Sequence, residues 1–479
     1  MNKKFLSLFT LAIVLLGLVF TVTGCGRKEG AGITLRIWNA IEPESAWEPL
    51  LTSYQEETGV KIEYTFRKEW KENPWRYEAD LLNALATGRG PDIVSIRNDW
   101  LPKHYDKAIP APEGVFARQD RQFKNLSNLD YLSRYFVPTV VLENVIDNQV
   151  YALPFYVDSL MLYCNRQIFE KASEELQIRE RANPTMSTAQ LEQARKILQN
   201  YPRSWQELLK AIELIKIVDN KKISRPAIAL GTAKNVSFAP DILISLMMQN
   251  GTQVVAYDLK KATFHLENFE TASVAYPGRD ALSFYSRFAD PNDPYYTWNS
   301  EQPNSEAMFL AGNLAMVIAD STLWEKIQQT NLKNQVDRVG FPQIDPERPR
   351  VVARYWTNIV TTNSQYPETA WDFLAFASQP EVLRGYLRIT SKPTPLKVAE
   401  EEIDVEDIPT LQSQIALGWY HGRNPREAEK IIGEMIDKAV KNRQNLAKLV
   451  DFSANKFTEM LQEQTPPPNS LFSQPISQQ

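Results

Sequence analysis

Polar and aromatic side chains follow several predicted strands of this chain or lie in nearby segments that connect them. These residues are Trp38, Asn39, Glu42, Arg97, Asn98, Asp99, Tyr156, Asp158, Phe238, Asp320, Trp324, Arg354 and Trp356. Aromatic rings can cover the apolar C–H face of a pyranose, while carboxylate, amide and guanidinium groups can hydrogen-bond to its hydroxyl rim. Hydrogen bonds in which one partner is charged are stronger than neutral ones. This mixture of groups is what the binding of a sugar would need.

The sequence contains no recognisable catalytic or metal-binding motif. It lacks a G-x-S-x-G elbow, a Walker loop and an H-E-x-x-H pair. His104, His265 and His421 are scattered without the spacing of metal ligands, so we expect surface or structural roles for them. We predict no catalytic residue, no metal and no cofactor. Paired carboxylates roughly 5–10 Å apart could still hydrolyse a glycosidic bond, and the 58 acidic residues leave that alternative open.

The charge balance argues against nucleic acid as a partner. The chain has 53 basic and 58 acidic residues, for a net charge of −5, whereas nucleic-acid binding needs a strongly basic face. Its length allows two or more packed cores, because single cores stop growing near about 250–300 residues. Of the two cysteines, Cys25 and Cys164, the second is expected to pack as a small hydrophobic residue.

The first residues are typical of a secreted bacterial lipoprotein. Two lysines precede a nearly uninterrupted apolar run at 5–20, as in a signal peptide. The stretch from Val22 to Cys25 resembles a lipobox, whose cysteine receives a diacylglycerol after cleavage. We therefore predict a signal peptide at 1–24, a lipidated tether at 25–32, and attachment to the outer face of the cell membrane through Cys25. A permanent membrane-spanning helix is the alternative.

The remaining chain alternates between strand and helix patterns, which predicts an α/β fold with parallel-type sheets flanked by helices. Predicted strands cover 33–40, 60–66, 92–96, 227–230 and 314–318, and amphipathic helices lie between and after them. The carboxyl ends of parallel strands form a common edge at which ligands bind. Residues 171–203 are charged and helix-prone and predict a surface insertion. The proline- and glutamine-rich end, 464–479, is predicted to be a disordered tail.

Several blocks resemble the family-1 extracellular solute-binding proteins of bacterial ABC importers, the group that includes maltose-binding protein. They are YQEETGVKIEY (54–64), LLNALATGRGPDIVSI (81–96), DNQVYALPFYVDSLMLYCNRQIF (147–169), PRSWQELLKAIELI (202–215), SEAMFLAGNLAMVIADSTLW (305–324) and ETAWDFLAFASQPEVLRGY (368–386). Their order and spacing cover nearly the whole chain after the leader.

The resemblance implies a type II periplasmic-binding-protein-like fold with two lobes joined by a hinge. We expect lobe 1 to comprise 33–155 and a return segment at 312–357, and lobe 2 to comprise 156–311 and C-terminal helices at 358–463. Ligand would bind between the lobes and be trapped when they close. In the family, positions equivalent to Asn39, Asn98, Asp99, Asp158 and Trp324 commonly contact ligand, and Phe238 resembles an aromatic stacking position.

The implied protein is a monomeric, non-catalytic receptor that delivers a sugar or oligosaccharide to ABC permease subunits in the membrane. A secreted carbohydrate-active enzyme is one alternative. Another keeps the fold but binds an anionic solute, such as a uronate or a phosphate ester, through Arg97 and Arg354. Each of these arginines could instead pair with a carboxylate across the cleft. Trp38 is equally compatible with a core position and a ligand contact.

Overall fold

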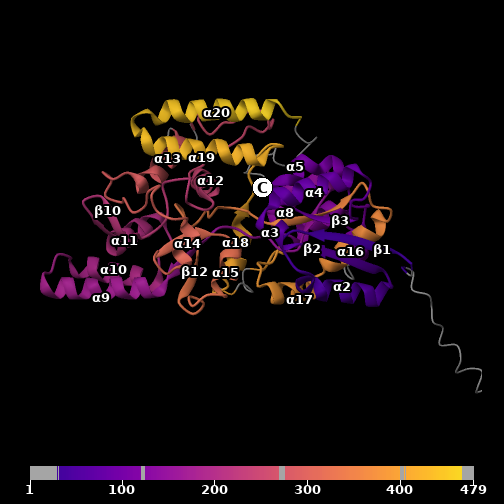
Figure 1. Cartoon of the computed structure of the whole chain (residues 1–479), viewed down its shortest axis with the longest axis horizontal. Helices are drawn as coiled ribbons and strands as arrows, with labels where there is room; N and C mark the ends of the chain where they lie inside the picture. Colours follow the sequence, from indigo (N-terminus) through magenta and orange to yellow (C-terminus); the bar gives the residue numbers. More distant parts are fainter. Residues whose placement is uncertain are drawn as a thin grey trace, which may run out of the picture.

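The computed structural model describes residues 30, 32–119, 125–268, 276–399, 404 and 406–465. Figure 1 shows two halves side by side. We call the half built on the six-stranded sheet lobe 1 and the half built on the three-stranded sheet lobe 2. The predicted signal peptide, Cys25 and nearly all of the predicted tail lie outside the described residues. No helix among the described residues is long and apolar enough to cross a membrane.

The sheet of lobe 1 has the strand order β2-β1-β3-β14-β4, with β7 also paired to β14. Its strands are β1 (Thr34–Asn39), β2 (Lys61–Phe66), β3 (Ile93–Arg97), β4 (Ala108–Ile109), β7 (Leu153–Pro154) and β14 (Trp356–Thr361). β1 runs parallel to β2 and β3, whereas β14 runs antiparallel to β3. The sheet is therefore mixed, which corrects the expectation of a parallel-type sheet.

Helices on both sides of this sheet bury the apolar faces seen in the sequence. They are α2 (Glu44–Thr58), α3 (Lys68–Glu72), α4 (Pro74–Ala86), α5 (Leu101–His104), α6 (Val115–Gln119), α7 (Asn128–Tyr135), α8 (Pro138–Asn144), α16 (Pro367–Ala377) and α17 (Pro380–Thr390). Trp47, Leu50 and Tyr54 of α2 are buried, and Gly59 ends the helix in the left-handed conformation, with φ 78°. Short 3-10 turns at Asn98–Trp100 and Tyr105–Lys107 and a hairpin of β5 (Val145–Ile146) and β6 (Gln149–Val150) complete the lobe.

Lobe 2 is built on an antiparallel sheet of β8 (Met161–Asn165), β11 (Met316–Ala319) and β12 (Val336–Gly340), ordered β11-β8-β12. Cys164 is buried in β8, as expected. The predicted strand at 227–230 is an extended segment that pairs with β11 through a single bridge, Ile228 to Met316. Two small pairs, β9 (Ile217–Asp219) with β10 (Lys222–Arg225) and β13 (Val351–Val352) with β15 (Ala416–Leu417), lie outside the main sheet.

The helices of lobe 2 are α9 (Arg166–Ala182), α10 (Thr188–Asn200), α11 (Trp205–Ile215), α12 (Ala239–Gln249), α13 (Pro277–Ser286), α14 (Ser305–Leu310), α15 (Ser321–Ile327), α18 (Ile408–Ile415), α19 (Pro425–Lys441) and α20 (Leu446–Gln462), with 3-10 turns at Arg287–Ala289 and Arg443–Asn445. The charged segment 171–203 forms most of the α9–α10 pair, which lies at one end of the molecule in Figure 1. Helices α19 and α20, in yellow, pack on each other and on α13.

Strand pairing corrects the expected division of the later chain between the lobes. Residues 312–340 were expected in lobe 1, but β11 and β12 flank β8 of lobe 2. Conversely, β14 pairs with β3, and α16 and α17 pack against α2, so 356–390 belongs to lobe 1. The apolar pattern predicts that a segment is buried, but it does not identify the neighbouring strand, because many strand pairings bury the same faces.

Two of the segments along which the chain crosses between the lobes, those around Asp158 and Arg354, lie side by side. Ser159 pairs with Ala353 in an isolated bridge. The backbone N–H of Arg354 donates to the carbonyl of Asp158 at 2.7 Å. This adjacency brings polar residues from distant parts of the sequence to the boundary between the two lobes.

Candidate functional site

A cavity of about 680 Å³ lies between the lobes, within the range of about 300–1,000 Å³ usual for small-molecule sites. Its lining residues are Ile41, Lys68, Lys71, Glu72, Pro74, Arg97, Asn98, Asp99, Tyr156, Asp158, Asp241, Asp320, Thr322, Glu325, Lys326, Gln329, Ala353, Arg354, Tyr355, Trp356, Lys392 and His421. Lobe 1 contributes the ends of β1 and β3 and helix α3, and lobe 2 contributes α12 and α15. Both lobes therefore face one shared space.

Most of the residues predicted at the site line this cavity. They are Arg97, Asn98, Asp99, Tyr156, Asp158, Asp320, Arg354 and Trp356. The other five, Trp38, Asn39, Glu42, Phe238 and Trp324, are not among its lining residues. The fold brings to the cavity the residues at and just after the end of β3, those in the two crossing segments, and Asp320, which follows β11.

The three predicted residues near the end of β1 have structural partners instead. The ring of Trp38 packs on Trp70, with 5.1 Å between the centroids, which agrees with the core alternative. Asn39 accepts hydrogen bonds from the backbone N–H groups of residues 41 and 42 and donates to Ser95. The carboxylate of Glu42 accepts from Trp47 Nε1 at 2.7 Å and from the Tyr386 hydroxyl.

The two aromatic residues predicted in lobe 2 carry arginines on their faces. The guanidinium carbon of Arg354 lies 4.8 Å from the ring centroid of Phe238, and that of Arg338 lies 4.5 Å from the ring of Trp324. Such pairs are attractive because the ring face is electron-rich. Here the rings hold cationic side chains beside the cleft, and Trp356 supplies an aromatic ring within the cavity lining.

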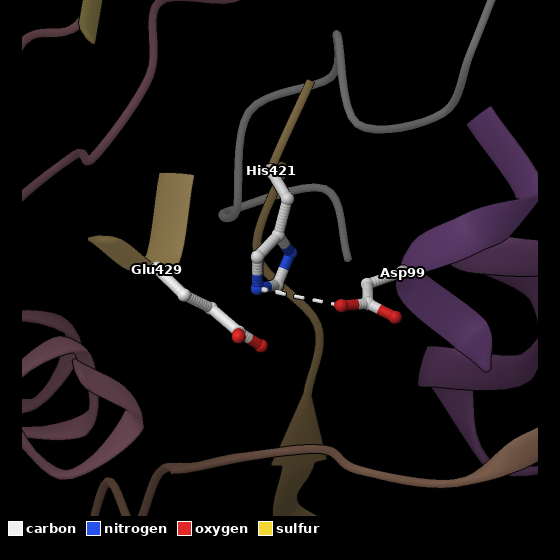
Figure 2. A group of neighbouring side chains, drawn as sticks. All are labelled: Asp99, His421 and Glu429. Atoms are coloured by element: carbon white, nitrogen blue, oxygen red, sulfur yellow. Dashed lines mark ion pairs between the residues drawn. The ribbon is translucent and has the colours of Figure 1, made fainter. Parts of the chain in front are cut away.

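Arg97 lies at the centre of a charged cluster that joins the lobes. Its Nη2 donates to Asp99 at 2.5 Å and to Glu429 of α19 at 2.6 Å. Figure 2 shows His421 between these two carboxylates. Asp99 and Glu429 hold the pKa of Arg97 above its usual range although burial acts to lower it. The alternative in which Arg97 pairs across the cleft is therefore realised.

Asp99, His421 and Glu429 are also the group among the described residues whose ligand atoms could surround a metal ion, all lying within 4.8 Å of one another. Nδ1 of His421 donates to the carbonyl of Trp419 at 2.9 Å, which leaves the lone pair of Nε2 directed at the carboxylates. Arg97 already donates to both carboxylates, so its guanidinium supplies the positive charge that a metal would bring. Burial lowers the pKa of His421.

Arg354 is similarly engaged by carboxylates of lobe 2. Its Nη1 donates to Asp241, and its Nε lies 3.9 Å from Oδ2 of Asp320. Oδ1 of Asp320 caps α15 by accepting from the backbone N–H of Thr322. No hydrogen bond from another described residue reaches Oδ2 of Asp320, so this oxygen keeps its capacity to accept.

Asp158 connects a crossing segment to the start of α15. Its Oδ2 accepts from the backbone N–H of Ser321 at 2.9 Å and from the Ser321 hydroxyl at 2.5 Å. Burial, followed by repulsion from Asp320, raises the pKa of this carboxyl. Two carboxylates on one wall of the cavity therefore favour a ligand that donates hydrogen bonds.

Tyr156 belongs to the same crossing segment as Asp158 and lines the cavity beside the buried Lys392. The ammonium of Lys392 lies 4.2 Å from the centroid of the Tyr156 ring. Among the described residues, none lies within hydrogen-bonding distance of the Tyr156 hydroxyl. At the mouth, Lys71 of α3 pairs with Glu325 of α15 at 3.0 Å, a further contact from one lobe to the other.

A family model for bacterial extracellular solute-binding proteins matches residues 39–383, more than half of the chain. The chain belongs to this family. Among similar solved structures, the cyclic α-maltosyl-1,6-maltose binding protein of Arthrobacter globiformis has a TM-score of 0.67 at 15% identity, covering 90% of this chain and 99% of that one. An ABC transporter solute-binding protein of Thermotoga lettingae, bound with α-D-tagatose, has a TM-score of 0.62 at 18% identity, covering 90% of this chain and 100% of that one. The sugar-binding protein MalE of Xanthomonas citri has a TM-score of 0.63 at 17% identity, covering 90% of this chain and 98% of that one.

These structures share the two-lobed α/β fold of the solute-binding proteins, which confirms the predicted fold class. Several cavity residues of this family member were missed from the sequence: Lys68, Lys71, Asp241, Glu325, Lys392 and His421. Asp241 follows a predicted stacking residue, Phe238, by three positions, which is a usable signal. Lys392 and His421 lie beyond the matched range 39–383, in segments without a strand pattern, and nothing in the sequence indicates where they fold.

Proposed function

We propose that this solute-binding protein is the receptor of an ABC importer and captures a sugar or small oligosaccharide between its lobes. The supporting observation is the interlobe cavity, in which buried polar groups from both lobes retain hydrogen-bonding capacity. A ligand that touches both lobes stabilises the closed arrangement relative to the open one. The closed receptor is then the form that a permease recognises.

The proposed contacts are the eight predicted residues that line the cavity, together with Lys392. Trp356 offers a ring for the apolar face of a pyranose, while Tyr156, Asp158, Asp320 and Arg354 offer donors and acceptors for hydroxyl groups. Phe238 and Glu42 lie against two of these residues, Arg354 and Lys392. Catalysis is not part of the proposal, and the sugar leaves chemically unchanged.

The charge balance favours a neutral ligand over the anionic alternative. Six lysine and arginine side chains and six aspartate and glutamate side chains line the cavity. Both arginines that would bind an anion already donate to carboxylates, Arg97 to Asp99 and Glu429, and Arg354 to Asp241. A uronate or phosphate ester would have to displace these pairs, whereas a hydroxyl group need not.

The similar structures are consistent with this ligand class, since those proteins are described as binding tagatose, cyclic maltosyl-maltose and other sugars. The proposal extends to localisation. The lipobox-like stretch ending at Cys25 supports a lipid anchor on the outer face of the membrane, and such an anchor keeps a receptor beside its permease.

A thermal-shift panel tests the proposal. D-Tagatose, maltose, maltotetraose, acarbose and D-glucuronate are added to purified protein, and each sugar is recovered afterwards and analysed by mass spectrometry. A ligand at 100 times its Kd should stabilise the protein by about 2.7 kcal/mol, and the recovered sugar should be intact. Absence of any shift across this and a wider glycan panel contradicts the sugar proposal, and a hydrolysed product supports the enzyme alternative.

A further inference from the structure

Lys392 places a buried positive charge on the boundary between the lobes. The residue is only 8% exposed. Its Nζ lies 3.7 Å from Oε1 of Glu42 in lobe 1 and 3.6 Å from Oε1 of Glu325 in lobe 2. The ammonium therefore lies between one carboxylate from each lobe, and it also lies over the ring of Tyr156.

The hydrogen-bonding capacity of this ammonium is unused. Both carboxylate oxygens lie beyond hydrogen-bonding distance from Nζ, and none of the other described residues accepts a hydrogen bond from it. A lysine has three N–H donors, and leaving such donors unsatisfied in a buried place is costly. Because Lys392 lines the cavity, an acceptor on a bound ligand can reach it.

The surroundings define the chemistry of that acceptor. Glu42, Glu325 and Asp158, with the Tyr156 hydroxyl, hold the pKa of Lys392 above its usual range although burial acts to lower it, so the ammonium stays charged. A negatively charged ligand group in this place would be repelled by the same carboxylates. A hydroxyl group, in contrast, can accept a hydrogen bond from Nζ and donate a hydrogen bond to Glu325.

We propose that Lys392 is a specificity-determining residue that selects a neutral hydroxyl group of the ligand and holds it between the lobes. This inference rests on the proposed sugar-binding function. The hydroxyl oxygen accepts a hydrogen bond from Lys392, and the hydroxyl donates a hydrogen bond to Glu325 of α15, so one ligand group contacts both lobes. Lys392 lies outside the stretch matched by the family model, which ends at residue 383.

The test compares Lys392→Met with Lys210→Met. Lys210 of α11 does not line the cavity, its side chain is 40% exposed, and it pairs with Glu213, so its substitution removes a charge without removing the proposed contact. Affinity is measured by calorimetry for whichever of D-tagatose, maltose, maltotetraose and acarbose binds the wild type. We expect Lys392→Met to weaken binding about ten- to hundred-fold and Lys210→Met to change it less than about threefold.

Each outcome bears on a separate claim. A wild type that binds none of these sugars overturns the proposed function and this inference with it. A wild type that binds, with Lys392→Met within threefold of it, overturns only the role of Lys392. Tighter wild-type binding of D-glucuronate than of D-glucose overturns the selection of a neutral group. If Lys392→Met does not fold, Lys392→Gln, which keeps amide donors but loses the charge, is used in the same titration and is expected to bind more weakly.

Discussion

Nη2 of Arg97, at the end of β3, lies 2.6 Å from Oε1 of Glu429 near the start of α19, although the two residues are 332 positions apart. The pair connects lobe 1 to lobe 2 beside the cavity, and both side chains are mostly buried. Contacts of this kind favour the arrangement in which the lobes lie together. They should therefore contribute to ligand affinity even if neither residue touches the ligand.

We expect Glu429→Gln to shift the protein toward an open arrangement and to weaken sugar binding by roughly tenfold. Small-angle scattering should show a larger radius of gyration for the ligand-free variant. Glu427→Gln is the matched control, because Glu427 lies on the same helix and pairs with Lys430 on its surface. Equal affinities for the two variants would show that the Arg97–Glu429 pair does not stabilise closure.

Tyr156→Phe separates ligand contact from stability. The Tyr156 hydroxyl has no hydrogen-bond partner among the described residues, so its removal should leave the melting temperature nearly unchanged and weaken sugar binding by about fivefold. Tyr285→Phe should do the opposite. The Tyr285 hydroxyl donates to the carbonyl of Thr232 in the interior of lobe 2, and its loss should cost about 1 kcal/mol of unfolding free energy. Identical behaviour of the two variants would argue against a Tyr156 contact.

Glu143 should make stability depend on pH. It accepts a hydrogen bond from Asn98 at 3.1 Å, and burial raises its pKa from 4.5 to about 8. Between these values the folded state holds a proton that the unfolded state releases. Wild-type stability should therefore fall as pH rises from about 5 to 8, by up to about 1.4 kcal/mol per pH unit from this group.

Glu143→Gln carries no such proton, so its stability relative to the wild type should increase over that pH range and level off above it. Denaturant unfolding at pH 5.5, 7 and 8.5 provides the measurement. Glu427→Gln, which changes a surface residue, serves as the reference for general effects of charge. A difference between Glu143→Gln and wild type that stays constant with pH would mean that Glu143 is already ionised in the folded protein.

Sugar affinity should be nearly independent of salt. A neutral ligand has no net charge for ions to screen, and the ion pairs nearest to it are buried, where screening is weak. We expect less than about a twofold change in Kd between 50 and 500 mM sodium chloride, measured by calorimetry. A steep loss of affinity with salt would instead favour an anionic ligand, for which Arg97 or Arg354 leaves its carboxylate partners and binds the ligand.

Much of the fold could be predicted from local patterns. The strands expected at 33–40 and 60–66 depend on local alternation, and the structure confirms both. The residues at the end of β3 and in the two crossing segments were predicted to contact ligand, and they line the cavity because strand ends and crossings meet where the lobes join. The assignment of 312–340 to lobe 1 and of 358–390 to lobe 2 was wrong, since alternation does not specify a partner strand.

Local patterns in the chain were enough to predict the class of fold, the positions of most strands and helices, and a set of polar residues near one edge of the sheet. Three features depend on how distant segments pack: which of these residues face the cavity, the pairing of Arg97 and Arg354 with carboxylates, and the presence of Lys392 and His421 at the site. The reason is physical: secondary structure follows from neighbours along the chain, whereas charge pairing and burial depend on segments separated by hundreds of residues.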